Sequence, residues 1–180
     1  MASPPQPDAS QPSSGYRVFQ APEAPSLNLR TFLAYVDALH QWDYDAIMAC
    51  FDEELEHRIL PASLGRPVRN KMQYEEHFKG VIPMFEKFRV TIHDVIESDD
   101  KIAVHASSKG ESTLGTPYTN EYTLMITFTS PSRGSPDVHV EELPKMRCVK
   151  EFVDSAFSAK FFSEEQDKMN AIAARVQETK

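Results

Sequence analysis

The hydrophobic pattern of the chain changes its period once, from helical spacing to strand alternation. Up to residue 83 the apolar residues recur every three or four positions, whereas residues 88–97, 102–114 and 118–129 alternate apolar with polar side chains and are rich in Val, Ile, Thr, Phe and Tyr. Alternation over runs of this length is typical of strands that bury one face. Helices followed by a set of strands predict an α+β fold, in which a helix layer covers a sheet.

Three helices are predicted ahead of the strands. One face of the first is marked by apolar residues at helical spacing, Leu29, Phe32, Leu33, Val36 and Leu39, and must be buried. Asp43 can cap a second, short helix. Asn70 and Gln73 have capping-box spacing for a third, which Pro83 ends. Residues 55–61, between the second and third helices, are predicted to form a short strand.

Turn residues separate the predicted strands and indicate how they connect. Residues 99–100 are two aspartates, and residues 115–117 are Gly-Thr-Pro. Turns of this chemistry favour pairing of consecutive strands, so an antiparallel meander is expected. A polar loop over residues 130–144 precedes a fourth long strand at about 146–154. A final helix is predicted from the capping-box spacing of Ser163 and Gln166, with an apolar stripe formed by Met169, Ile172, Ala173 and Val176.

Residues 1–26 differ in composition from the rest of the chain. They hold six of the thirteen prolines together with Ser, Gln and Ala, a mixture that buries too little apolar surface to offset the entropy of ordering. We expect a disordered tail over residues 1–26 and one domain over residues 27–180. Tyr16, Val18 and Phe19 form the apolar cluster of this tail, and docking of the cluster on the domain or on a partner is the alternative.

The net charge limits the partners that this chain fits. It has 27 acidic and 19 basic residues, a formal charge of −8. Nucleic acids and anionic membranes both need a basic footprint, so neither is expected as a partner, and a small-molecule ligand fits better.

Residues 1–14 are polar and proline-rich, unlike a secretory signal, and no run of 18 apolar residues exists. The sequence therefore predicts a cytoplasmic protein.

The end of the last predicted strand and three earlier motifs resemble a known family. The strand ends in Glu151-Phe152-Val153-Asp154-Ser155, and the earlier motifs are His57-Arg58-x-x-Pro61-x-Ser63-Leu64-Gly65-Arg66, Glu76-His77-Phe78 and Asn120-Glu121-Tyr122. In this order they resemble the SnoaL-like branch of the nuclear-transport-factor-2-like superfamily, above all its fungal members, over residues 28–162. The chain departs from the usual pattern at residues 130–144, which replace a short Asp-Gly-Lys turn.

The resemblance implies both a shape and a chemistry. The implied shape is a cone-shaped half-barrel, in which a curved antiparallel sheet and three N-terminal helices enclose a pocket. Scytalone dehydratase, ketosteroid isomerase and polyketide cyclases use such a pocket for proton transfer. Members commonly form homodimers, and here Thr123, Met125 and Thr127 offer a weakly polar outer sheet face for such pairing.

Glu151 is the candidate general base. Its strand neighbours are mainly apolar, and a carboxylate in an apolar pocket is desolvated, which raises its pKa toward neutrality. The resemblance to the family favours this inward position. The alternative is a surface carboxylate that pairs with Lys150 or Arg147.

His57 and His77 are the candidate acid partners of Glu151. Strand alternation places His57 on the apolar face with Leu55 and Ile59, as either a core histidine or a pocket residue. His77 flanks the apolar face of the third helix. Asp154 is a candidate for substrate binding, although Asp-Ser before Ala-Phe also suits a helix cap.

Three further residues are candidate substrate-binding groups. Tyr122 shares its strand face with Leu124 and Ile126, and its hydroxyl or the amide of Asn120 could orient a carbonyl oxygen. Arg58, Arg66 and Arg69 cluster around the loop after the short strand, where one of them, with Arg66 as the candidate, either binds an anionic substrate group or is solvated.

These residues predict a cofactor-free enzyme of lyase or isomerase type that acts on a small carbonyl compound. The sequence has no phosphate-binding glycine loop and no metal-ligand spacing, so neither a cofactor nor a metal is expected. Cys50 and Cys148 are predicted to be buried, reduced thiols. The alternative function is a non-catalytic module of the same fold that binds a small apolar ligand or dimerises.

Overall fold

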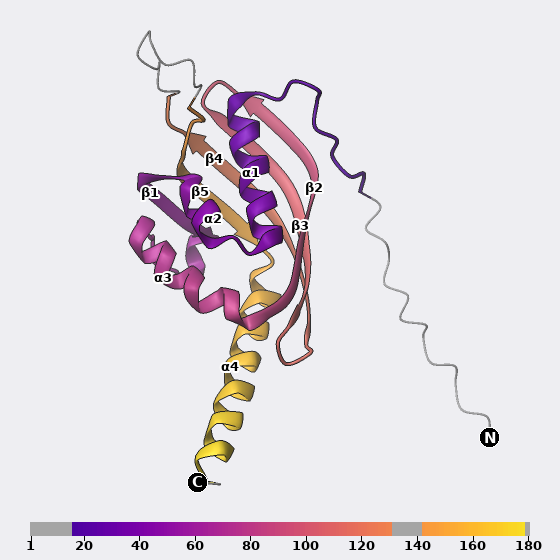
Figure 1. Cartoon of the computed structure of the whole chain (residues 1–180), viewed down its shortest axis with the longest axis vertical. Coiled ribbons are helices and arrows are strands. Elements are labelled where there is room, and N and C mark those ends of the chain that lie inside the picture. Colours follow the sequence, from indigo (N-terminus) through magenta and orange to yellow (C-terminus); the bar gives the residue numbers. More distant parts are fainter. Residues whose placement is uncertain (1–15, 131–141, 179–180) are drawn as a thin grey trace, which may run out of the picture.

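A single five-stranded sheet organises the protein (Figure 1). The computed structural model describes residues 16–130 and 142–178. Strands β1 (Phe51–Leu60), β2 (Phe85–Ser98), β3 (Lys101–Ser112), β4 (Pro117–Phe128) and β5 (Met146–Val153) lie in the order β1-β5-β4-β3-β2. The predicted antiparallel meander is confirmed from β2 through β5. β1, which starts earlier than the predicted residue 55, pairs with β5 in parallel.

The three predicted N-terminal helices are confirmed with their caps. They are α1 (Leu27–Gln41), α2 (Tyr44–Ala49) and α3 (Lys71–Val81). Asp43 accepts the backbone N–H of Ala46, and Asn70 and Gln73 form the complete capping box of α3. One-turn 3-10 helices at Ala62–Leu64 and Ile82–Met84 connect β1 and α3 to the segments that follow them.

The main core lies between α1 and the concave face of the sheet. The predicted apolar face of α1 is buried, with Phe32 fully covered, and it packs against inward residues of β3 and β4 such as Val104 and Ile126. In Figure 1 the long strands β2 and β3 curve around α1. Because side chains alternate along each strand, every second residue of β4 and β5 faces the space that α1 and α3 enclose. The result is the α+β fold that the sequence pattern predicts, with the half-barrel shape that the family resemblance implies.

Part of the proline-rich segment contacts this domain. The backbone N–H of Phe19 donates to the carbonyl oxygen of Ile92 at 2.9 Å, and the Phe19 side chain packs against the core. The ring of Tyr16 lies against those of His93 and His105. Residues 1–15 of the expected tail lie outside the described residues, as do residues 131–141 of the polar loop.

The last helix begins earlier than the sequence predicts. α4 spans Ser155–Glu178, so Ser163 lies inside the helix and the predicted capping box does not form. Asp154 caps the helix instead, because its Oδ1 accepts the backbone N–H of Phe157 at 3.1 Å. The first half of α4 packs on the sheet through Phe161, which is buried, while Met169 and Ile172 of the predicted stripe are exposed. In Figure 1 the second half projects beyond the sheet.

Within residues 16–130 and 142–178, no helix is long and apolar enough to cross a membrane.

Candidate active site

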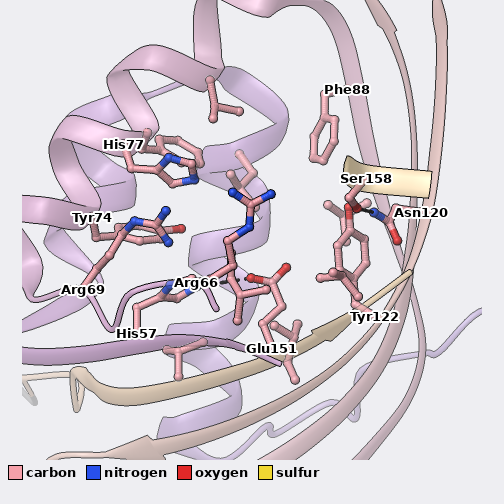
Figure 2. Close-up of a pocket in the computed structure, with 18 of the residues that line it drawn as sticks. His57, Arg66, Arg69, Tyr74, His77, Phe88, Asn120, Tyr122, Glu151 and Ser158 are labelled. Atoms are coloured by element: carbon pink, nitrogen blue, oxygen red, sulfur yellow. Dashed lines mark hydrogen bonds and ion pairs between the residues drawn. The ribbon is translucent and has the colours of Figure 1, made fainter. Parts of the chain in front are cut away.

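A pocket of about 570 Å³ opens between the concave sheet face and the helices α1, α3 and α4. Most of its lining is apolar, and a volume of this size suits a drug-sized organic molecule. Figure 2 shows its polar groups: His57, Arg69, Tyr74 and His77 lie on one side, and Asn120, Tyr122 and Ser158 on the other. Glu151 and Arg66 lie between the two sides.

His57 and Glu151 form a hydrogen-bonded pair in this pocket. In the parallel pairing of β1 and β5, His57 lies opposite Val149, and Glu151 lies two residues further along the same face. His57 Nε2 and Glu151 Oε2 are 3.2 Å apart. The His57 side chain is 4% exposed and that of Glu151 is 22% exposed. The carboxylate is therefore held by a buried imidazole while one side remains open to the pocket.

The environment of His57 defines the proton on its ring. A carboxylate only accepts hydrogen bonds, so Nε2 of His57 carries the hydrogen that Glu151 Oε2 accepts. Nδ1 is buried and has no hydrogen-bond partner among the described residues. The ring packs on that of Tyr74, with centroids 4.6 Å apart. Among the described residues, the His57 ring therefore makes its side-chain hydrogen bond with Glu151.

Two arginines and a histidine border the pair. Arg69 is fixed by two backbone hydrogen bonds with His57, of 2.9 and 3.0 Å, which attach its loop to the edge of β1. Burial, followed by the charge of Arg66, lowers the pKa of Arg69. His77 lies exposed at the pocket mouth, yet partial desolvation of its ring, followed by Arg69 and His57, lowers its pKa to about 4. His77 is therefore neutral at pH 7.

A chain of hydroxyl groups lines the opposite wall. The Tyr122 hydroxyl lies 2.7 Å from Ser108 Oγ and 3.3 Å from the Tyr118 hydroxyl. Asn120 Nδ2 donates to the Tyr118 hydroxyl at 2.9 Å and to Ser158 Oγ at 2.6 Å. Burial, followed by Tyr118 and Glu151, raises the pKa of Tyr122. Tyr122 therefore keeps its proton at neutral pH and offers a hydrogen-bond donor rather than an anion.

The structure brings most of the predicted site residues to one pocket. Its lining includes Glu151, His57, His77, Tyr122, Asn120 and Arg66. Asp154 has a different position: its carboxylate caps α4, and its backbone N–H donates to Asn120 Oδ1 at 3.0 Å. The carbonyl oxygen of Asn120 is thereby engaged in joining β4 to α4, so this amide orders the wall instead of pointing freely into the pocket.

Several pocket residues were not predicted. Tyr118 alternates with Asn120 and Tyr122 on β4, so strand alternation alone was a sufficient signal. Arg69, which the sequence indicates only as part of the arginine cluster around the loop, reaches the pocket through its bridge to β1. Ser158 reaches it because α4 begins at Ser155. The last two positions depend on tertiary pairing and on an early helix start, which the local sequence pattern does not indicate.

A family profile and two named proteins match more than half of this chain. The profile of the SnoaL-like domain matches residues 32–131. The chain is 28% identical over 139 residues to a protein of Pestalotiopsis fici named monooxygenase ptaG, covering 76% of this chain and 89% of the relative. It is 30% identical over 122 residues to a protein of Claviceps purpurea named monooxygenase, covering 67% and 70%.

Two solved structures have a fold similar to that of this chain. The BvnE pinacolase of Penicillium brevicompactum superposes with a TM-score of 0.63 at 26% identity, covering 79% of this chain and 91% of that one. An NTF2-like protein of unknown function from Burkholderia pseudomallei superposes with a TM-score of 0.57 at 15% identity, covering 73% and 93%. The second likeness concerns the fold alone.

Proposed function

The chain belongs to the SnoaL-like domain family, with the nuclear-transport-factor-2-like fold, and we propose that it is an enzyme that moves protons on a small carbonyl compound. The observation that carries the proposal is the hydrogen bond between His57 and Glu151 inside a largely apolar pocket. Glu151 is the proposed general base. His57 is the proposed acid partner, because its Nε2 hydrogen lies on the Glu151 carboxylate.

The proposed reaction begins with removal of a proton from the carbon next to a carbonyl group. The C–H bond breaks, its proton joins a Glu151 oxygen, and the electron pair moves to the carbonyl oxygen as an enolate. A donor must stabilise that oxygen, and the Tyr122 hydroxyl, which stays protonated, is suitable. Return of the proton to another carbon completes an isomerisation. Its transfer to a departing hydroxyl, which leaves as water, completes a dehydration.

The names of the relatives support small-molecule chemistry and add a second candidate reaction. Two relatives are named monooxygenases and one structural neighbour a pinacolase. The same proton abstraction could open a cofactor-free oxygenation, in which an activated CH₂ group and O₂ give C=O and water. The carbon supplies all four electrons in that reaction, so no further reductant is needed.

Solvent exchange tests the proposal. Two aryl ketones would be incubated with the protein in D₂O: 1-tetralone, whose acidic C–H is next to the carbonyl, and anthrone, whose acidic CH₂ is conjugated to the carbonyl through the rings. Deuterium incorporation would be followed by mass spectrometry and O₂ uptake by an electrode. We expect exchange that the wild type accelerates and Glu151→Gln does not. O₂ uptake coupled to ketone formation would assign the oxygenase reaction. If the wild type exchanges no ketone faster than Glu151→Gln does, the proposal fails and a non-catalytic binding module takes its place.

A further inference from the structure

The pocket has two chemically different ends. Arg66 and Arg69 lie beside the His57–Glu151 pair, whereas aromatic side chains line the part toward α4 and β2. In Figure 2, Phe88 lies across the cavity from Tyr74, and the Arg66 guanidinium extends into the space between them. A ligand that fills the pocket therefore meets guanidinium groups at one end and rings at the other.

The guanidinium end has more positive charge than its carboxylates balance. Arg69 is half-buried, and its Nη1 is buried without a hydrogen-bond partner among the described residues. Glu151 is bonded to His57, and Glu76, the other carboxylate of the lining, lies 3.6 Å from Lys79 and faces solvent. A buried guanidinium hydrogen without an acceptor costs free energy, which an anionic ligand group would recover.

The aromatic end is a wall of packed rings that can cover one face of a planar ring system. Trp42 stacks on Phe85 with ring centroids 6.4 Å apart and lies 5.6 Å from Phe88. Tyr118 and Phe162 continue the wall, with centroids 6.1 Å apart. Stacking and edge contacts with these aromatic side chains favour a ligand that carries an aromatic ring system.

We propose that the pocket binds a planar aromatic carboxylate, with its ring system against Trp42 and Phe88 and its carboxylate on Arg66 and Arg69. A guanidinium can donate two parallel hydrogen bonds to a carboxylate, so this group matches the unpartnered Nη1 of Arg69 and the exposed guanidinium of Arg66 better than a neutral carbonyl does. The proposal rests on the proposed function and narrows its substrate to an aryl carbonyl compound that also carries a carboxylate.

A matched pair of ligands tests the charge preference without any turnover. 2-Naphthoate and 2-naphthamide have the same ring system and nearly the same shape, but only the first has a charge at pH 7.5. Isothermal titration calorimetry would measure both at physiological salt. We expect 2-naphthoate to bind the wild type at least about tenfold more tightly, and Arg69→Gln and Arg66→Gln to lose most of that preference while still binding 2-naphthamide.

Arg58→Gln is the control variant. Arg58 follows His57 on β1 but is exposed and pairs with Glu56 at 2.7 Å. Its replacement by Gln therefore removes the same charge as the two pocket variants do, without changing the pocket lining. It should keep the preference. Equal affinity of both ligands for the wild type, or equal loss of preference in Arg58→Gln, would overturn the proposal. Glu151→Gln should abolish proton transfer yet keep the preference for 2-naphthoate, so failure of the proposed function and failure of this inference have different signatures.

Discussion

His57 Nε2 and Glu151 Oε2 lie 3.2 Å apart although 94 residues separate them in sequence. The parallel pairing of β1 with β5 produces this contact, because it sets Glu151 beside the strand position two residues beyond His57. The strands on which the two residues stand are thus direct neighbours in a rigid sheet. A pair held on strands is positioned more accurately than one held on loops.

The Tyr122 hydroxyl should matter for turnover and somewhat for stability. Tyr122→Phe removes the proposed donor to the enolate oxygen, so kcat should fall about 100-fold or more. It also leaves the buried hydroxyl of Ser108 without this partner, which should lower the free energy of unfolding by about 1 kcal/mol. Steady-state kinetics and urea unfolding would measure both effects. A kcat equal to that of the wild type would remove Tyr122 from the mechanism.

His77 should titrate far below an ordinary histidine. Its ring signal in NMR should report a pKa of about 4, and Arg69→Gln should raise that value, since one of the charges that lower it is lost. In the unfolded chain the His77 ring binds its proton near pH 6.5, whereas in the folded protein it does so only near pH 4. The contribution of His77 to the free energy of unfolding is therefore fully present above pH 6.5 and is lost as the pH falls toward 4. His77→Asn should lose less stability over this interval. An unchanged His77 pKa in Arg69→Gln would contradict this electrostatic coupling.

Asp154 should affect stability through the α4 cap. Asp154→Ala should lower the free energy of unfolding by about 1 kcal/mol, and Asp154→Asn should restore most of it because asparagine is an equally good cap. The KM of either variant should stay near that of the wild type. A raised KM without loss of stability would instead support the substrate-binding role that the sequence suggested.

We propose that the outer sheet face forms a homodimer. Met125 of β4 and Phe152 of β5 are 38% and 43% exposed, and the register places Phe152 opposite Thr123. Light scattering at micromolar concentration should give the mass of a dimer, and the double variant Met125→Lys, Phe152→Lys that of a monomer. Met72→Lys, at a more exposed site on α3 (67%), is the control and should remain dimeric. A monomeric wild type would refute the proposal.

The local pattern predicted the elements better than their pairings. The alternation around His57 and Tyr122 placed both side chains inward, and the spacing of Asn70 and Gln73 located the start of α3, because these features depend on near neighbours in sequence. The assignment of a capping box to Ser163 was wrong, because Asp154 offers an earlier cap whose first turns can pack on the sheet through Phe161.

The same holds for the candidate site: the sequence indicates its residues but not the contacts between them. Glu151 and His57 could each be selected by residue type and face, but their contact depends on the parallel β1–β5 pairing, which no turn between the strands encodes. Arg69 enters the site through a backbone bridge to β1, a long-range feature of the same kind. The resemblance to the SnoaL-like family supplied what periodicity could not, namely that these strands close around a pocket.

The central claim is that Glu151 is the base of this pocket, and Glu151→Gln tests it most directly. The amide keeps the shape and can still accept the Nε2 hydrogen of His57, but it cannot take a proton from the substrate. We predict that the rate of deuterium exchange into a responsive aryl ketone falls about 100-fold or more, while the free energy of unfolding stays within about 0.5 kcal/mol or rises. Glu121→Gln, on the outer face beside His105, should leave the exchange rate unchanged. An exchange rate in Glu151→Gln equal to that of the wild type would contradict the account.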